Sequence, residues 1–184
     1  MKQVEITITI FTVIDKEIKM LLIKKQSEPY KGYWLIPRIM ASKKLAIDES
    51  LKEILKKLNL PDVKVFQNKT ISTLEKDELN YINIVYVGII DSIRLGISEM
   101  ESGFEQEWFS IKKIPKMAYN YQELVEDNIQ FLRERIKKAS ILNLFFPSDF
   151  TFPEIQAVLE KINDVKLDRR NLRKKFINNN LVDE

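Results

Sequence analysis

The residues most suited to chemistry in this 184-residue chain form a basic cluster near its C-terminus. Six basic residues and one acid, Asp168, lie between Lys166 and Lys175, so the local charge is +5, whereas the whole chain carries +3. Arginine and asparagine can pair with guanine and adenine, and arginine and lysine bind phosphates. The cluster therefore indicates contact with DNA, although a solvated basic helix packed on its neighbour would show the same pattern.

Composition excludes several other kinds of site. The sequence has no cysteine and no histidine, which rules out disulfides, thiol nucleophiles, Cys/His zinc sites and histidine-based triads. Its four glycines are not clustered, so glycine-rich phosphate loops are absent, and only carboxylates could hold a metal. With 45% apolar and 31% charged residues, the chain is expected to be globular, neither disordered nor membrane-spanning.

The basic cluster falls on the second of two short amphipathic helices. The first, residues 151–163, carries apolar residues on one face, and its opening T-F-P-E predicts a capping box. Asp168 is expected to cap the second helix, which buries Leu172 and Phe176. Two such helices joined by a tight turn form a helix-turn-helix pattern. The residues expected to face outward are Arg170, Asn171, Lys174, Lys175 and Asn178, with Arg169 and Arg173 nearer the core edge.

The rest of the chain is expected to form an α+β body that carries this helix pair. Period-two alternation predicts strands at residues 4–13 and 18–23, joined by a turn at Asp15-Lys16. Apolar residues at helical spacing predict a helix from Ala46 to Leu58, with lysines on its outer side. The remaining expected elements are strands at residues 64–73, 81–90 and around Trp108-Phe109, a helix through Lys138, and an apolar connector at residues 141–150.

One segment of this body resembles the Nudix hydrolases. Gly32, Trp34, Ile36 and Pro37 stand where that family has G-x-W-x-L-P before its signature, G-x5-E-x7-R-E-U-x-E-E-x-G-U, where U is a bulky aliphatic residue. Glu53 matches the central glutamate of the signature. At the positions that depart, the two glycines are replaced by Arg38 and Asn59, the first glutamate by Lys44, the arginine by Lys52, and the two ligand glutamates by Lys56 and Lys57.

These departures bear on the chemistry that the resemblance implies. Nudix hydrolysis uses magnesium held by the glutamates of the signature, and lysine repels that ion. We therefore expect no catalytic residues, no metal site and no cofactor. The basic side chains could instead neutralise a phosphorylated ligand, in an anion site made of Arg38, Lys52, Glu53, Lys56 and Lys57. The alternative is the solvated helix face of a decayed site.

Both halves together resemble the Nudix-related transcriptional regulators, the NrtR-like family. The run EWFSIKKIPKMAYNY is similar to its passage from the last Nudix strand into the linker, and FPSDFTFPEIQAVLEKINDVKLDRRNLRKKF to its C-terminal block. The resemblance implies a catalytically degenerate Nudix-like domain with a mixed sheet (residues 1–115), a linker helix and connector (116–149), and a helix-turn-helix or winged-helix domain with a truncated wing (150–184). Its candidates for DNA contact are Arg169, Arg170, Asn171, Arg173, Lys174 and Lys175.

The same resemblance implies partners. Members of the family act as homodimers on double-stranded DNA operators, and they respond to an effector such as ADP-ribose or another phosphorylated sugar or nucleotide. Because the N-terminal segment lacks a signal-peptide pattern, we expect a cytoplasmic protein with no membrane partner. The expected function is that of a ligand-responsive transcriptional regulator, in which the Nudix-like domain senses a metabolite without hydrolysing it.

A second interpretation is open, that of a Nudix-fold pyrophosphohydrolase with a non-standard set of carboxylates. Glu53 would then act with acids of the segment SEMESGFEQE, which are Glu99, Glu101, Glu105 and Glu107. Those acids could equally be solvated loop residues. Metal-dependent turnover of a pyrophosphate substrate would separate this enzyme from a sensor.

Overall fold

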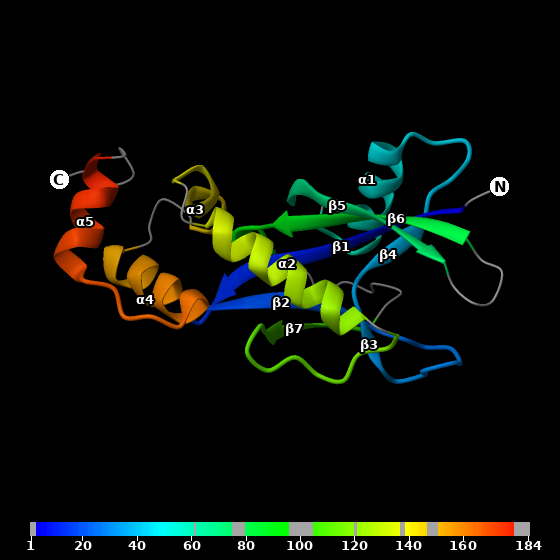
Figure 1. The fold of residues 1–184 in the computed structure, drawn as a ribbon, viewed down its shortest axis with the longest axis horizontal. Helices are drawn as coiled ribbons and strands as arrows, with labels where there is room; N and C mark the ends of the chain where they lie inside the picture. The colour runs from blue at the N-terminus through cyan, green and yellow to red at the C-terminus, as the bar shows by residue number, and fades with distance from the viewer. Residues whose placement is uncertain are drawn as a thin grey trace.

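The computed structural model describes residues 3–60, 62–74, 80–95, 105–119, 121–136, 139–146 and 151–178. Within these ranges, seven strands form one mixed sheet, and a pair of helices lies at one end of the molecule (Figure 1). The strands are β1 (Gln3–Ile14), β2 (Glu17–Lys24), β3 (Trp34–Leu35), β4 (Arg38–Met40), β5 (Lys64–Leu74), β6 (Asn80–Ile89) and β7 (Gln106–Ser110). The helices are α1 (Ile47–Lys57), α2 (Tyr121–Arg135), α3 (Ala139–Phe145), α4 (Phe152–Asn163) and α5 (Arg169–Asn178), with a 3-10 helix η1 (Ser92–Leu95).

The sheet is built around β1, in the order β3-β2-β1-β6-β5. Strand β1 pairs with β6 in parallel and with β2 and β4 in antiparallel fashion, while β7 pairs with β2. The β1–β2 hairpin turns at Asp15 and Lys16, whose φ angles of 53° and 59° are the left-handed values that tight hairpins require. The strands and the turn predicted from the sequence are confirmed.

Strand β1 is buried on both of its faces. One face presents the apolar side chains of Ile6, Ile8 and Ile10, and the other presents Glu5 and the threonines at positions 7 and 9, all buried. Helix α2 covers the polar face, since its Asn128 side chain donates to a β1 threonine (Figure 1). The alternation in the sequence therefore separates an apolar layer from a buried polar layer, instead of separating core from solvent.

Helix α1 confirms the helix predicted from Ala46 to Leu58. The Glu49 carboxylate accepts the Ala46 backbone N–H at 3.0 Å and so caps the N-terminal turn. The C-terminal end is closed by Asn59, whose φ of 56° is left-handed. Asn59 stands where the Nudix signature has a glycine, and asparagine is one of the few other residues that adopt this conformation readily.

The segment between α2 and α4 differs from the prediction. Residues 141–150 were expected to form a connector, but their first part belongs to α3, in which Leu142 and Phe145 are buried. The apolar segment packs as expected, but its helical part was not predicted because a seven-residue helix is too short to establish an apolar period in the sequence. Residues 147–150 lie outside the described part of the chain.

Helices α4 and α5 form the predicted helix pair. The Glu154 carboxylate accepts the backbone N–H of Thr151 at 2.9 Å, which confirms the capping box. Phe152 of α4 and Phe176 of α5 pack edge to face, with ring centroids 5.6 Å apart. Among the described helices, none is both long enough and apolar enough to cross a bilayer.

Candidate nucleic-acid interface and effector site

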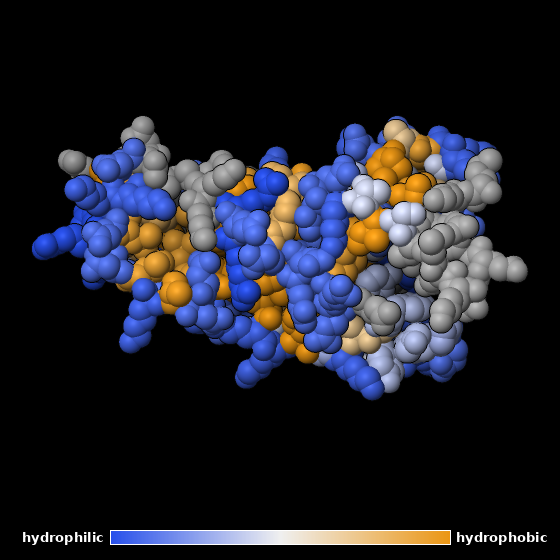
Figure 2. Space-filling model, in the orientation of Figure 1, coloured by the Kyte–Doolittle hydropathy of each residue, from blue (hydrophilic) through white to orange (hydrophobic). Residues whose placement is uncertain are grey.

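Helix α5 holds the basic cluster in a fixed frame. The Asp168 side chain accepts the backbone N–H of Asn171 at 2.8 Å, as the predicted cap requires, and Phe176 is buried. Figure 2 shows hydrophilic side chains covering the end of the molecule that α5 forms. The polar residues proposed for DNA contact are all exposed there, namely Arg169, Arg170, Asn171, Arg173, Lys174 and Lys175.

The turn between α4 and α5 is held by Glu160. Its carboxylate accepts hydrogen bonds from the Gln156 side chain at 3.0 Å and from the Leu167 backbone N–H at 2.9 Å. These two bonds, the one from Gln156 first, lower the pKa of the Glu160 carboxyl below its ordinary value. The turn begins at Asp164, whose φ of 51° is left-handed. The orientation of α5 relative to α4 is therefore set by polar contacts as well as by the Phe152–Phe176 packing.

The lysines of α1 lie on its solvent side. Lys52, Lys56 and Lys57 are exposed, and the Glu53 carboxylate forms an ion pair with Lys57 at 2.6 Å. Both partners are about half exposed, so this pair contributes little to stability. Within the described residues, no group of three acidic, histidine or cysteine side chains is arranged to hold a metal ion.

Arg38 points to a different place from the lysines of α1. Its guanidinium donates to Glu5 at 2.9 Å and to the Tyr121 hydroxyl at 3.0 Å, and it lies 5.0 Å from the Tyr119 ring centroid. Burial alone lowers the pKa of Arg38, but the tyrosines and Glu5 outweigh burial and raise it above its ordinary value. In the described contacts, Arg38 joins β1 to the start of α2, and none of them links it to Lys52, Lys56 or Lys57.

A cluster of four tyrosines lies beside Arg38, which contacts two of them, Tyr119 and Tyr121. Tyr30 and Tyr119 come from loops far apart in the sequence, and their ring centroids lie 5.0 Å apart. Tyr33 packs on Tyr30, and Tyr121 packs on Tyr119, both at 5.7 Å. We call Arg38 with these four tyrosines the tyrosine–arginine cluster. Tyr30 and Tyr119 are 44% and 38% exposed, so ring surface remains available on this cluster.

The backbone of the tyrosine–arginine cluster is strained. Tyr30 and Tyr119 have φ angles of 68° and 55°, which are left-handed values that bulky residues rarely adopt. Neighbouring backbone bonds hold both loops, since Gly32 donates to the Lys25 carbonyl at 2.8 Å and Ala118 donates to the Trp34 carbonyl at 2.7 Å. Strain of this kind concentrates at ligand-binding sites. Exposed rings beside a guanidinium can stack on a planar group and neutralise an anion.

Comparison with known proteins identifies the relatives of this architecture. Residues 141–184 match the family model of the NrtR DNA-binding winged helix domain. The structure also matches the crystal structure of Shewanella oneidensis NrtR complexed with a 27mer DNA, with a TM-score of 0.80, 16% identity, and coverage of 95% of this chain and 82% of that chain. The chain is NrtR-like in fold, and residues 141–184 are similar to the NrtR winged helix domain. The α+β fold and the resemblance predicted from the sequence are thereby confirmed.

Two curated relatives extend the match. The ADPR responsive transcriptional repressor NtrR of Acinetobacter baylyi is 21% identical, over 97% of this chain and 74% of its own length. The ADP-ribose pyrophosphatase of Methanocaldococcus jannaschii is 26% identical, over 65% of this chain and 70% of its own length. The first match reaches through the basic helix, whereas the second covers about two thirds of the chain. Of these two relatives, the one that covers nearly the whole chain is named as a repressor.

The acids named for the alternative enzyme take different places in the NrtR-like structure. Glu105 forms an ion pair with Lys24 at 2.6 Å, and the hydrogen bond from Lys24 lowers the pKa of the Glu105 carboxyl. Glu107 is exposed on β7. Glu99 and Glu101 lie outside the described residues. In the described ion pairs, Glu53 and Glu105 each face a lysine, so the structure gives no carboxylate pair among them.

Sequence reasoning missed the tyrosine–arginine cluster. The resemblance drew attention to Gly32 and Trp34, and Tyr30 and Tyr33 lie in the same block without matching a motif position. Tyr119 and Tyr121 belong to the run identified only as a linker. Both tyrosine-rich segments follow an expected strand, but these strands, β2 and β7, pair antiparallel, so the strand ends gave no signal that the two segments meet.

Proposed function

We propose that this NrtR-like protein is a transcriptional regulator that binds double-stranded DNA through α5 and changes its DNA affinity when an effector of the ADP-ribose type binds. The observation that carries the proposal is the set of six exposed polar residues on one capped, anchored helix, inside the segment that matches a DNA-binding winged helix domain. The proposal also draws on the names of the relatives, an ADPR responsive repressor and an NrtR solved with DNA.

The two groups of α5 residues have different proposed roles. Arg170, Asn171, Lys174 and Lys175 belong to the outward-facing group that would enter the major groove, where arginine and asparagine make paired hydrogen bonds to bases. Arg169 and Arg173, nearer the core edge, would bind phosphates and fix the register. Two copies in a homodimer would place two α5 helices on one operator. Residues 1–115 would then be the sensing domain, 116–149 the linker and 150–184 the DNA-binding domain, in a cytoplasmic protein.

The proposed effector site is the tyrosine–arginine cluster, and the lysines of α1 that were predicted to share an anion site with Arg38 lie at a different place in the structure. An ADP-ribose molecule carries an adenine ring, which exposed tyrosine faces can stack on, and a diphosphate, which Arg38 can neutralise. Lys52, Lys56 and Lys57 would add positive charge on α1, with Glu53 paired to one of them. Lysines in place of the ligand glutamates support sensing without hydrolysis, since they offer no oxygen ligands to magnesium.

The decisive experiment measures DNA binding by the full chain. A duplex recovered from genomic fragments by selection is titrated by fluorescence anisotropy, with and without ADP-ribose, over a range of salt concentrations. We expect log affinity to fall steeply with log salt, and Arg170→Ala or Lys174→Ala to weaken binding about tenfold or more. The matched control is Lys43→Ala, an exposed lysine ahead of α1. If no fragment is selected at moderate salt, the proposal is wrong.

A further inference from the structure

Helix α2 connects the tyrosine–arginine cluster to the helix pair. At its first residue, the Tyr121 hydroxyl accepts a hydrogen bond from Arg38 at 3.0 Å. Near its last turn, Arg133 Nε donates to the Ile162 backbone carbonyl of α4 at 2.9 Å, and Arg133 Nη2 lies 3.9 Å from the Asp164 carboxylate. The two contacts are about 18 Å apart along the axis of one helix, at 1.5 Å per residue.

The middle of α2 is pinned to the sheet by Asn128. Its side-chain amide donates to Thr9 Oγ1 at 2.7 Å and accepts from Asn68 Nδ2 at 2.7 Å, and its exposed fraction is 0%. Sliding the helix along the sheet would break both buried hydrogen bonds at once, which is costly. Tilting about Asn128 would keep both bonds and move the two ends in opposite directions. The geometry therefore favours tilting over sliding.

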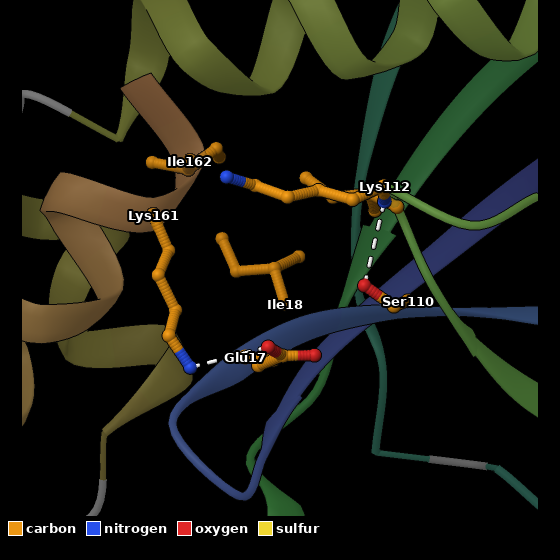
Figure 3. Close-up of a pocket in the computed structure, with 7 residues that line it drawn as sticks. Glu17, Ile18, Ser110, Lys112, Lys161 and Ile162 are labelled. Atoms are coloured by element: carbon orange, nitrogen blue, oxygen red, sulfur yellow. Dashed lines mark hydrogen bonds and ion pairs between the residues drawn. The ribbon is translucent and has the colours of Figure 1, made fainter. Parts of the chain in front are cut away.

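The contact between the sheet and α4 is of a kind that can adjust to such a tilt. Lys161 of α4 donates to Glu17 of the β1–β2 hairpin at 3.2 Å, and Lys112 pairs with Asp164 just beyond α4. Figure 3 shows Glu17, Lys112 and Lys161 around a small open cleft, with Ile18 between them. The charged partners are all roughly half exposed, so their rearrangement costs little. We call Glu17, Lys112, Lys161 and Asp164 the charged junction.

We propose that α2 is a lever that couples the effector site to the DNA-binding helices. A ligand that engages Arg38 alters its bond to Tyr121 and moves the first turn of α2. The helix tilts about Asn128, and Arg133 displaces the C-terminal end of α4 while the charged junction re-forms around it. For this coupling to occur, the effector must bind more tightly to the protein with α4 in one position than to the protein with α4 in the other position. The inference rests on the proposed function for the identity of the ligand, but the mechanical link can be tested without ligand or DNA.

The ligand-free test uses hydrogen exchange of the α4 amides in the full chain. Tyr121→Phe removes the bond to Arg38 and keeps the ring. We expect it to change α4 exchange rates at least twofold in the otherwise native chain, and to have no effect when Arg133→Gln is also present. The matched control is Arg135→Gln on the same helix, because the Arg135 guanidinium lies over the Phe131 ring of α2 itself, at 4.1 Å. If Tyr121→Phe leaves α4 exchange unchanged, or acts equally in the Arg133→Gln background, the lever is refuted.

The ligand-dependent test compares two measurements on the same variants. Calorimetry gives the affinity for ADP-ribose, and anisotropy gives the change in DNA affinity that ADP-ribose causes. We expect Arg133→Gln to bind ADP-ribose within about twofold of the native chain but to lose most of the change in DNA affinity, whereas Arg135→Gln keeps both. An undiminished response in Arg133→Gln overturns the lever. Absence of ADP-ribose binding in the native chain instead refutes the proposed effector, and the exchange experiment then decides the lever alone.

Discussion

The two ends of α2 are held by opposite kinds of electrostatic contact. At the first end, Arg38 pairs with Glu5, whose exposed fraction is only 4%, beneath a layer of tyrosine rings. At the other end, Arg133 and the charged junction lie among partly exposed partners. A buried pair is costly to break and fixes one geometry, whereas exposed pairs are weak, screened by salt and replaceable. The comparison shows that the Arg38–Glu5 pair at the first end of α2 holds one geometry, whereas the ion pairs at the other end can re-form.

The largest expected effect comes from the buried end. Arg38→Met leaves the Glu5 carboxylate buried without its guanidinium, and we expect it to lower the free energy of unfolding by about 2–4 kcal/mol. The control is Lys161→Met at the charged junction, which should cost less than about 1 kcal/mol. Urea unfolding of the two variants gives both values. If both variants lose the same free energy of unfolding, the proposed contrast between the two ends of α2 is wrong.

An intermediate effect is expected at the pivot. Asn128→Leu keeps the branching of the side chain at Cγ, although leucine is larger, and it leaves Thr9 and Asn68 without their partner at this site, so the free energy of unfolding should fall by about 1–3 kcal/mol. Gln130→Leu, on the exposed side of the same helix, should change it by less than about 0.5 kcal/mol. Thermal or urea unfolding measures both. A neutral Asn128→Leu would show that α2 is not pinned.

The smallest effect is a pH dependence confined to the charged junction. The hydrogen bond from Lys161 lowers the pKa of the Glu17 carboxyl below its ordinary 4.5. A carboxyl with a lowered folded-state pKa stabilises the fold above its unfolded pKa, and this contribution is lost as pH falls through the folded value. Hydrogen exchange in α4, corrected for its intrinsic pH dependence, should therefore rise as pH falls below about 4.5. Glu17→Gln should reduce that rise, whereas a rise of undiminished size would assign it elsewhere, for example to Asp164.

The elements of the fold could be predicted because their signals are local. Apolar spacing located α1, and the T-F-P-E sequence located the start of α4, with the Glu154 bond at 2.9 Å as expected. The polar face of β1 could not be interpreted in this way. Glu5, with the threonines of that strand, looks like an exposed position in an alternating pattern, but its partner Arg38 lies 33 residues away. Only the tertiary fold supplies the partners that allow those groups to be buried.

The two candidate sites were predictable from the sequence to different degrees, because one is formed by neighbouring residues and the other by residues far apart in the chain. The exposed residues of α5 follow from one helix and its cap, so sequence alone identified Arg170 and Lys174 as outward-facing. The anion site predicted around α1 placed Arg38 with Lys56 because they share a family motif. In the structure, Arg38 contacts Tyr119, in the loop before α2, and Tyr121, the first residue of α2, which lie about 80 residues further along the chain and which no local pattern connects to it.

The turn at Asp15 and Lys16 has a consequence for the reach of the DNA-binding helices. Because this turn sets where Glu17 stands, it also sets where Lys161 can anchor α4. Adding one residue to the turn would reverse the facing of the side chains beyond it and carry Glu17 away from the helix. The length of this turn therefore helps to fix where α4 and α5 stand relative to the sheet.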